Sequence, residues 1–214
     1  MGRRALRRID PALDLAEHLL VLESIAQPLN GAAVFGRAAP LEIEVGSGKG
    51  LFLAAAAAGD PQASFLGIEI LAKYARFTAA RLATRELPNA RIIHGDAQHL
   101  FRAWLADNSV RAVHVYFPDP WWKARHKKRR VMSAGFLRDV QRVLEPGGTL
   151  HFWTDVEEYF QTSLELIAAE TALGGPHAVV EKPADHDLDY RTHFERRMRL
   201  HNAPVYRAEF RKGQ

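Results

Sequence analysis

The sequence contains no cysteine among its 214 residues, so disulfide bonds, thiolate catalysis and cysteine-ligated zinc are excluded. Its ten histidines are scattered and never adopt the HExxH spacing of a zinc helix, so we expect no metal site. The longest apolar run, residues 51–58, is far too short to cross a bilayer. Acidic residues interrupt the stretch behind the basic N-terminus, which argues against a signal peptide. These absences predict a soluble cytoplasmic protein that binds no membrane and no metal.

Negative charge is in the minority, with 25 acidic side chains against 29 Lys and Arg, a net charge of +4 and a pI near 9.5. This balance favours an anionic partner. The length fits one domain, so we expect residues 1–214 to form a single domain with a basic, helical N-terminal extension over residues 1–35. Leucines at helical spacing predict an amphipathic helix over residues 11–26, followed by a loop over residues 30–40.

An unusual segment occupies residues 115–130, VYFPDPWWKARHKKRR. It begins as a buried strand and is followed by Asp119 between two prolines, which hold the acid in one place outside the sheet. Trp121 and Trp122 come next, and tryptophan faces can either stack on bases or close a core. Six cations then attract phosphate, unless they form only a solvated surface: Lys123, Arg125, Lys127, Lys128, Arg129 and Arg130.

Short β-rich runs alternate with helical segments from residue 41 onward. Strands are expected near residues 41–45, 65–70, 91–94, 110–117 and 149–153, with helices between them and over 156–171. Such alternation is typical of βαβ units and of a parallel sheet covered on both faces. We therefore predict an α/β fold with an open, doubly wound sheet, similar to a Rossmann fold.

A carboxylate lies at or just behind the end of each of these five strands. In an open α/β sheet, ligands bind beyond the carboxyl ends of the strands, so all five acids would face one rim. Helix capping is an alternative explanation for the third and fifth of them, but the first and second lie in apolar strands, where an unpaired charge is costly. In chain order the acids are Glu44, Glu69, Asp96, Asp119 and Asp155.

The first of these turns reads EVGSGKG, with glycines at alternate positions behind a strand and at the start of a helix. Gly46 and Gly48 allow a tight turn and close approach of a ligand to the backbone. The pattern matches neither the GxGxxG dinucleotide fingerprint nor a Walker loop. It suits a nucleoside with a cationic group, whose ribose hydroxyls Glu69 could accept.

Several motifs of the sequence resemble those of a known family. EVGSGKG is similar to the first motif of class I S-adenosylmethionine-dependent methyltransferases, and FPDPWWKARHKKRR resembles the signature of bacterial tRNA (guanine-N7)-methyltransferases of the TrmB type. The resemblance extends through FLGIEI, IIHGDA, EPGGTLHFWTD and THFE. It implies S-adenosyl-L-methionine as cofactor, tRNA as partner and a guanine at position 46 of the tRNA variable loop as target. It also implies a mostly parallel, seven-stranded sheet with its last strands near residues 178–181 and 205–210.

The same resemblance implies roles for single residues. Glu44, Glu69 and Asp96 would bind S-adenosyl-L-methionine, and Asp119 would lie beside both the cofactor and the target base. The residues that would hold the tRNA substrate are Lys123, Asp155, Thr192, His193, Phe194 and Glu195.

The expected chemistry agrees with the residues that are present. Guanine N7 carries a lone pair and no proton, so its methylation needs no general base and no Ser/His/Asp arrangement. Asp119 is the candidate for stabilising the cationic product ring. The N1–H and N2–H donors of guanine call for a carboxylate, either Asp155 or Glu195. The alternatives are a class I methyltransferase for small molecules, which has no use for the basic run, and a non-catalytic RNA-binding protein, which has no need of five rim acids.

Overall fold

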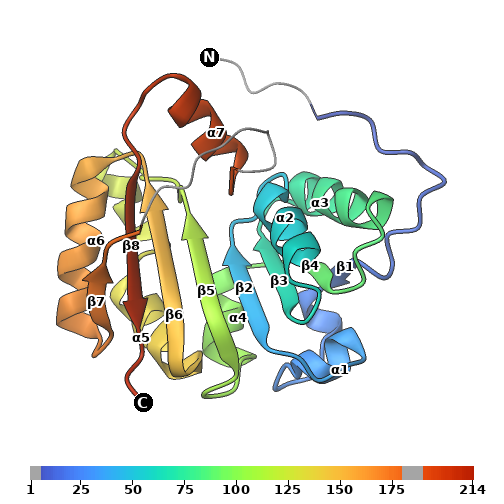
Figure 1. The fold of residues 1–214 in the computed structure, drawn as a ribbon, viewed down its shortest axis with the longest axis horizontal. Helices are drawn as coiled ribbons and strands as arrows, with labels where there is room; N and C mark the ends of the chain where they lie inside the picture. The colour runs from blue at the N-terminus through green and yellow to red at the C-terminus, as the bar shows by residue number, and fades with distance from the viewer. Residues whose placement is uncertain (1–5, 180–189) are drawn as a thin grey trace.

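The computed structural model describes residues 6–179 and 190–214, and the strands form one eight-stranded sheet of order β1-β4-β3-β2-β5-β6-β8-β7 (Figure 1). The first six strands in that order are parallel, and β8 is antiparallel to both of its neighbours. This arrangement confirms the predicted fold class. The strands are Leu19–Val21 (β1), Leu41–Val45 (β2), Ser64–Glu69 (β3), Ala90–His94 (β4), Val110–Tyr116 (β5), Leu144–Thr154 (β6), Gly174–His177 (β7) and Tyr206–Arg211 (β8).

Helices lie on both faces of the sheet (Figure 1). On one face are α2 (Leu51–Gly59) and α3 (Ala72–Thr84), and on the other α4 (Ala97–Ala103), α5 (Ala134–Val143) and α6 (Glu157–Glu170). The helix α7 (His193–Leu200) lies above the carboxyl edge, at the opposite end of the sheet from α1 (Gly31–Phe35). Among the described residues, no helix is long and apolar enough to cross a membrane.

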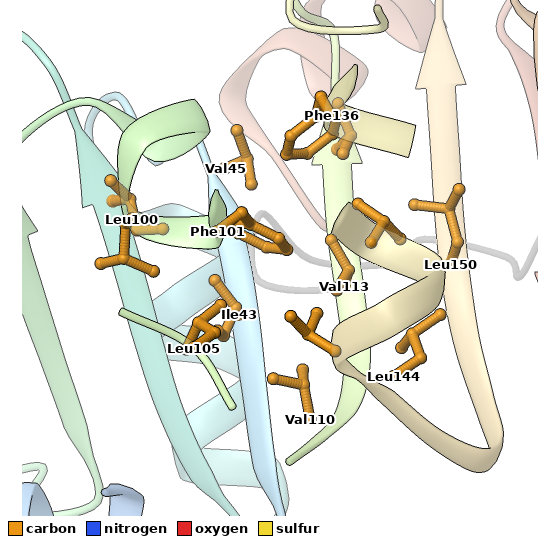
Figure 2. Packing of buried hydrophobic residues seen from close by; sticks show 14 of the residues in the cluster. Ile43, Val45, Leu100, Phe101, Leu105, Val110, Val113, Phe136, Leu144 and Leu150 are labelled. Atoms are coloured by element: carbon orange, nitrogen blue, oxygen red, sulfur yellow. The ribbon is translucent and has the colours of Figure 1, made fainter. Parts of the chain in front are cut away.

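The larger core lies between the sheet and α4, α5 and α6. Ile43 and Val45 of β2 and Val113 of β5 meet Phe101 and Phe136 there, all of them buried (Figure 2). Successive side chains of a strand point to opposite faces, so the residues between these apolar ones face the α2 side instead. On that face β2 and β5 carry polar and aromatic side chains, namely Glu42, Glu44, His114 and Tyr116.

The predicted helix over residues 11–26 is wrong. Leu19–Val21 instead form β1 along the free edge of β4, and Leu22–Ser24 form the short 3-10 helix η1. Helix propensity is a weak preference, and here pairing of the chain with an unpaired strand edge outweighs it.

The predicted loop over residues 30–40 is also wrong in part, because it contains the short helix α1. Asn30 accepts a hydrogen bond from the Ala33 N–H (3.2 Å), and Gly36 ends the helix at a positive φ of 68°.

The sheet has one strand more than the seven predicted, namely β1. Its penultimate strand in the chain, β7, lies at Gly174–His177 rather than over residues 178–181. Ala178 and Val179 belong to no strand, and residues 180–181 lie outside the described part. The family resemblance implied a strand there, but pairing with β8 begins soon after α6 ends, so β7 lies a few residues earlier. The last predicted strand is confirmed as β8.

Candidate active site at the carboxyl edge of the sheet

The glycine turn between β2 and α2 is fixed to the neighbouring strand β3. Gly46 and Gly48 have positive φ angles of 77° and 54°, a region that only glycine adopts without strain. The N–H groups of Gly46 and Ser47 donate to the Ile68 carbonyl (2.8 and 3.2 Å). Gly67 in β3 makes room for this turn, because a Cβ there would lie 2.5 Å from the Ser47 Oγ. Sequence reasoning missed Gly67, whose only sequence signal is a glycine inside an apolar strand.

Glu69 ends β3 and joins the turn to the next helix. Its Oε2 accepts from the Gly48 N–H (2.9 Å) and its Oε1 from the Leu71 N–H (2.8 Å). The side chain is buried, whereas the following Ile70 and Leu71 are 64% and 43% exposed. A carboxylate oxygen can accept more than one hydrogen bond, so Glu69 is positioned rigidly and can still accept from a ligand.

Glu44 is buried beside this turn, with one oxygen, Oε2, that has no hydrogen-bond partner in the described structure. Burial, reinforced by the charge of Glu69 and opposed by the Ser47 hydroxyl, raises its pKa to about 8. Burying a carboxylate oxygen without a partner costs free energy in the unliganded protein, and a bound hydrogen-bond donor or cation would offset that cost. Glu44 is therefore a candidate ligand-binding residue on structural grounds as well.

Asp96 and Asp155 follow β4 and β6, and the capping explanation holds for only one of them. Asp96 caps α4, accepting from the Gln98 N–H (2.9 Å). Asp155 does not cap α6, because the N-cap residue of α6 is Val156 and no described side chain makes a capping bond there; the Val156 N–H itself donates to Thr154 Oγ1 (3.3 Å). Within the described residues the half-buried Asp155 carboxylate has no hydrogen bond or ion pair, so it can accept from a ligand.

The chain leaves β5 through strained backbone. Phe117 has a positive φ of 51°, rare for an aromatic residue, while its N–H donates to the Trp153 carbonyl (2.8 Å). Pro118 follows, then Asp119, which is exposed and makes no hydrogen bond or ion pair with any described residue. Arg130 fixes the far end of this loop, with its Nε–H donating to the Pro120 carbonyl (2.7 Å).

The basic run behind Asp119 forms the 3-10 helix η2 (Ala124–Arg129). Four of its cations are exposed, Arg130 is half-buried over the Tyr159 ring (4.6 Å), and Lys127 lies within η2. The exposed cations are Lys123, Arg125, Lys128 and Arg129.

The helix α7 brings the THFE segment to the same edge. Thr192 caps α7 through its hydroxyl and the Glu195 N–H (2.9 Å), and His193 is the first helical residue. The Phe194 ring packs against Phe117, with 4.8 Å between ring centroids. The buried Glu195 accepts from the Arg191 backbone N–H (2.7 Å) and from Arg207 (3.3 Å). Thus Thr192, Phe194 and Glu195 lie beside the loop that carries Asp119.

A buried polar chain links this segment to the sheet, and sequence reasoning missed it. Arg191 donates to the Tyr116 hydroxyl (3.3 Å), which lies 2.9 Å from His114 Nδ1, while His114 Nε2 lies 2.8 Å from Glu42 Oε2. Burial favours a neutral Glu42, but hydrogen bonds from His114 and Arg111 outweigh it and hold its pKa at about 2. Burial lowers the pKa of His114.

These pKa directions assign the protons. Ionised Glu42 can only accept, so neutral His114 carries its proton on Nε2, and its Nδ1 accepts from the Tyr116 O–H. Each polar group in the chain is then satisfied, and Arg191 is held in place directly before the cap of α7. The only sequence signal is polar residues at alternate positions of otherwise apolar strands.

Within residues 6–179 and 190–214, no three His, Asp or Glu side chains are grouped so that they could hold a metal ion.

Comparison with known proteins agrees with this geometry. Two solved structures share the fold at 18% identity: the 16S rRNA methyltransferase KamB, with a TM-score of 0.62 over 85% of this chain and 94% of that chain, and the aminoglycoside resistance methyltransferase NpmB1, with 0.55 over 81% and 87%. Residues 38–208 match a protein family described as "Putative methyltransferase".

Curated relatives are much closer in sequence. The tRNA (guanine-N(7)-)-methyltransferase of Rhodopirellula baltica is 49% identical over 218 residues, which cover 99% of this chain and 80% of that protein. The protein of the same name from Alcanivorax borkumensis is 38% identical over 87% of this chain and 78% of its own length. The chain therefore belongs to the tRNA (guanine-N(7)-)-methyltransferase family.

Proposed function

We propose that this protein acts in the cytoplasm and transfers the methyl group of S-adenosyl-L-methionine to N7 of a guanine in tRNA, at position 46 of the variable loop. The observation that carries the proposal is the loop behind β5. Within twelve residues it joins an exposed, unpartnered carboxylate at the ligand-binding edge, Asp119, to a run of exposed cations that ends at Arg130. A small-molecule enzyme has no use for the cations, and a non-catalytic RNA-binding protein has no use for the acid.

The residues present fit the cofactor. Its cationic ammonium and sulfonium groups match the unpartnered, buried oxygen of Glu44. Glu69 is oriented by two backbone N–H groups and has capacity left to accept from the ribose hydroxyls. The exposed Ile70 and Leu71 offer an apolar surface for adenine, and the second carboxylate oxygen of Asp96 is available at the same edge. When bound, the cofactor supplies an electrophilic methyl group on sulfur.

Asp119 and its loop carry out the protein's part of the reaction. Guanine N7 attacks with its own lone pair, so no residue has to remove a proton, and positive charge moves from sulfur to the purine ring. Asp119 lies just beyond β5 with no competing partner among the described residues, so it can stabilise that charge. Strained backbone at Phe117 and the flanking prolines fix its position.

The Watson–Crick edge of guanine requires a carboxylate acceptor, and the geometry favours Asp155 over Glu195. Glu195 is buried, and its carboxylate is already ion-paired with Arg207 and Arg199 in addition to accepting from the Arg191 N–H. Asp155 is half-buried at the end of β6 and has no partner among the described residues. We therefore assign to Asp155 the N1–H and N2–H donors, and to Glu195 the task of holding α7 in place. Lys123, Thr192, His193 and Phe194 complete the substrate side of the site.

The cations of η2 and its flanks would bind phosphate without reading bases. Phosphate contacts determine affinity and register, while base contacts determine specificity. Arg125, Lys128 and Arg129 are exposed, and Lys127 and Arg130 belong to the same run.

The test is transfer of labelled methyl from S-adenosyl-L-methionine to unmodified tRNA, with Asp119→Asn as the variant. We expect the wild type to label tRNA, and Asp119→Asn to bind the cofactor normally but to label tRNA at least ~100-fold more slowly, the effect of losing one preorganised electrostatic group. Wild-type labelling of small acceptors but not of tRNA would contradict the proposal. An Asp119→Asn variant that is as active as the wild type would remove Asp119 from the mechanism.

A further inference from the structure

The two tryptophans of the β5 loop have different surroundings. Trp121 is half-buried inside the loop, with the His126 ring edge-on at 5.7 Å and the Arg129 guanidinium 5.1 Å from its ring centre. Trp122 is 65% exposed and makes no ring contact with any described residue. Packing therefore explains Trp121 but leaves Trp122 unexplained.

The backbone maintains this difference at a cost. Trp121 has a φ of 44°, in the left-handed region that bulky residues rarely adopt without strain. Arg130 holds the loop closed behind it through the Pro120 carbonyl. Backbone strain of this kind persists where it positions a functional group, and the side chain that follows the strained residue is Trp122.

The neighbours of Trp122 identify the chemistry of that partner. Lys123 and Arg125 are exposed directly behind it, and Asp119 lies only three residues before it. Three residues span at most about 11 Å, whereas stacked nucleotides rise about 3.4 Å per step. A nucleotide strand that presents its guanine to Asp119 and its phosphates to the cations therefore has the Trp122 ring within the length of a few nucleotides.

We propose that Trp122 stacks on the base next to the target guanine. An enzyme that contacts the Watson–Crick edge of its target base draws that base out of its stack, which leaves the face of the neighbouring base open. An exposed aromatic ring covers such a face, and stacking of this kind contributes about 1–3 kcal/mol per base with little preference for sequence. The inference rests on the proposed function for the identity of the RNA.

The test compares tRNA binding by wild type, Trp122→Ala, Trp122→Leu and Trp122→Phe at several salt concentrations. We expect Trp122→Ala and Trp122→Leu to raise the Kd for tRNA by about 5- to 150-fold. Trp122→Phe should keep most of the affinity, because it keeps an aromatic face. The salt dependence should be unchanged in all three, whereas Lys128→Ala should lower the log–log slope by about one. Quenching of tryptophan fluorescence by tRNA should diminish in Trp122→Phe.

Three results would overturn the proposal. One is a wild-type Kd in Trp122→Ala. Another is an equal loss of tRNA affinity in Trp122→Leu and Trp122→Phe, or a loss of affinity that comes with a lower log–log salt slope. The third is dissociation of a protein dimer by Trp122→Ala with RNA binding unchanged, which would make the ring a contact for a second copy. Equal melting temperatures and cofactor affinities verify the fold of each variant. A wild type that binds tRNA but transfers no methyl to it would refute the proposed function, while the stacking result would still stand.

Discussion

The unusual state of Glu44 makes cofactor binding a proton-release reaction. With a pKa of about 8, this carboxyl is roughly nine-tenths protonated at pH 7 in the unliganded protein. A cationic ligand on its unpartnered oxygen favours the ionised form and draws the pKa down. Binding of S-adenosyl-L-methionine at pH 7 should therefore release close to one proton, and at pH 9 nearly none.

The assay is titration calorimetry in two buffers of different ionisation enthalpy, since the difference in apparent enthalpy counts the protons released. Glu44→Gln is the matched control, because it keeps the shape of the side chain and cannot ionise. We expect it to bind the cofactor weakly and without buffer-dependent heat. Proton release equal in wild type and Glu44→Gln would show that another group is responsible. Absence of release from the wild type at pH 7 would refute the reasoning about Glu44.

The same group makes the stability of the unliganded protein depend on pH. Its pKa is raised from 4.5 to about 8 on folding, so the protonated form is favoured in the folded state. The associated stability is present in full below pH 4.5 and is lost as pH rises from 4.5 through 8. The ceiling of that loss is roughly 5 kcal/mol, at 1.36 kcal/mol per pH unit. Denaturant unfolding at pH 5 and pH 8 should show a loss in wild type that Glu44→Gln lacks.

Three further predictions follow from the site and its surroundings. Removing Lys127 and Lys128 together should weaken binding to all tRNAs alike and lower the log–log salt slope by about two, as filter binding would measure; a change in which guanine is methylated would contradict a phosphate role. Asp155→Asn should lower kcat/KM for tRNA at an unchanged melting temperature. Glu195→Gln should lower the melting temperature, because it weakens a buried carboxylate's ion pair with Arg207; the reverse pattern would exchange their roles. Gly67→Ala should destabilise by about 1–3 kcal/mol in chemical denaturation, since its Cβ would lie 2.5 Å from Ser47 Oγ, and an unchanged stability would mean that the turn can shift at no cost.

Much of the ligand-binding edge could be predicted from sequence because its residues follow strand ends. Period and length identify parallel strands, and topology then places Glu44, Glu69 and Asp119 on one rim without any knowledge of contacts. For Asp96 and Asp155 the pattern could not separate helix capping from a free carboxylate. That choice depended on one capping hydrogen bond, which Asp96 accepts from the Gln98 N–H and which Asp155 does not accept at the start of α6.

What could not be predicted depends on contacts between distant segments. The pairing of β1 with β4 joins residues about seventy positions apart, and local helical spacing gave no sign of it. The polar chain from Glu42 to Arg191 crosses two strands and the start of α7, so each member looks unremarkable in its own segment. The contrast between Trp121 and Trp122 follows from the positive φ of Trp121, which the residue type argues against.

The most direct test of the central claim is to label unmodified bulk tRNA with the purified protein and radioactive S-adenosyl-L-methionine, and then to cleave the RNA chemically at N7-methylguanosine. We expect labelled tRNA that is cut once, in the variable loop. If the labelled tRNA resists the cleavage, the assigned fold and cofactor would still stand, but N7 would not be the target atom. Tight cofactor binding without any transfer to tRNA would contradict the account as a whole.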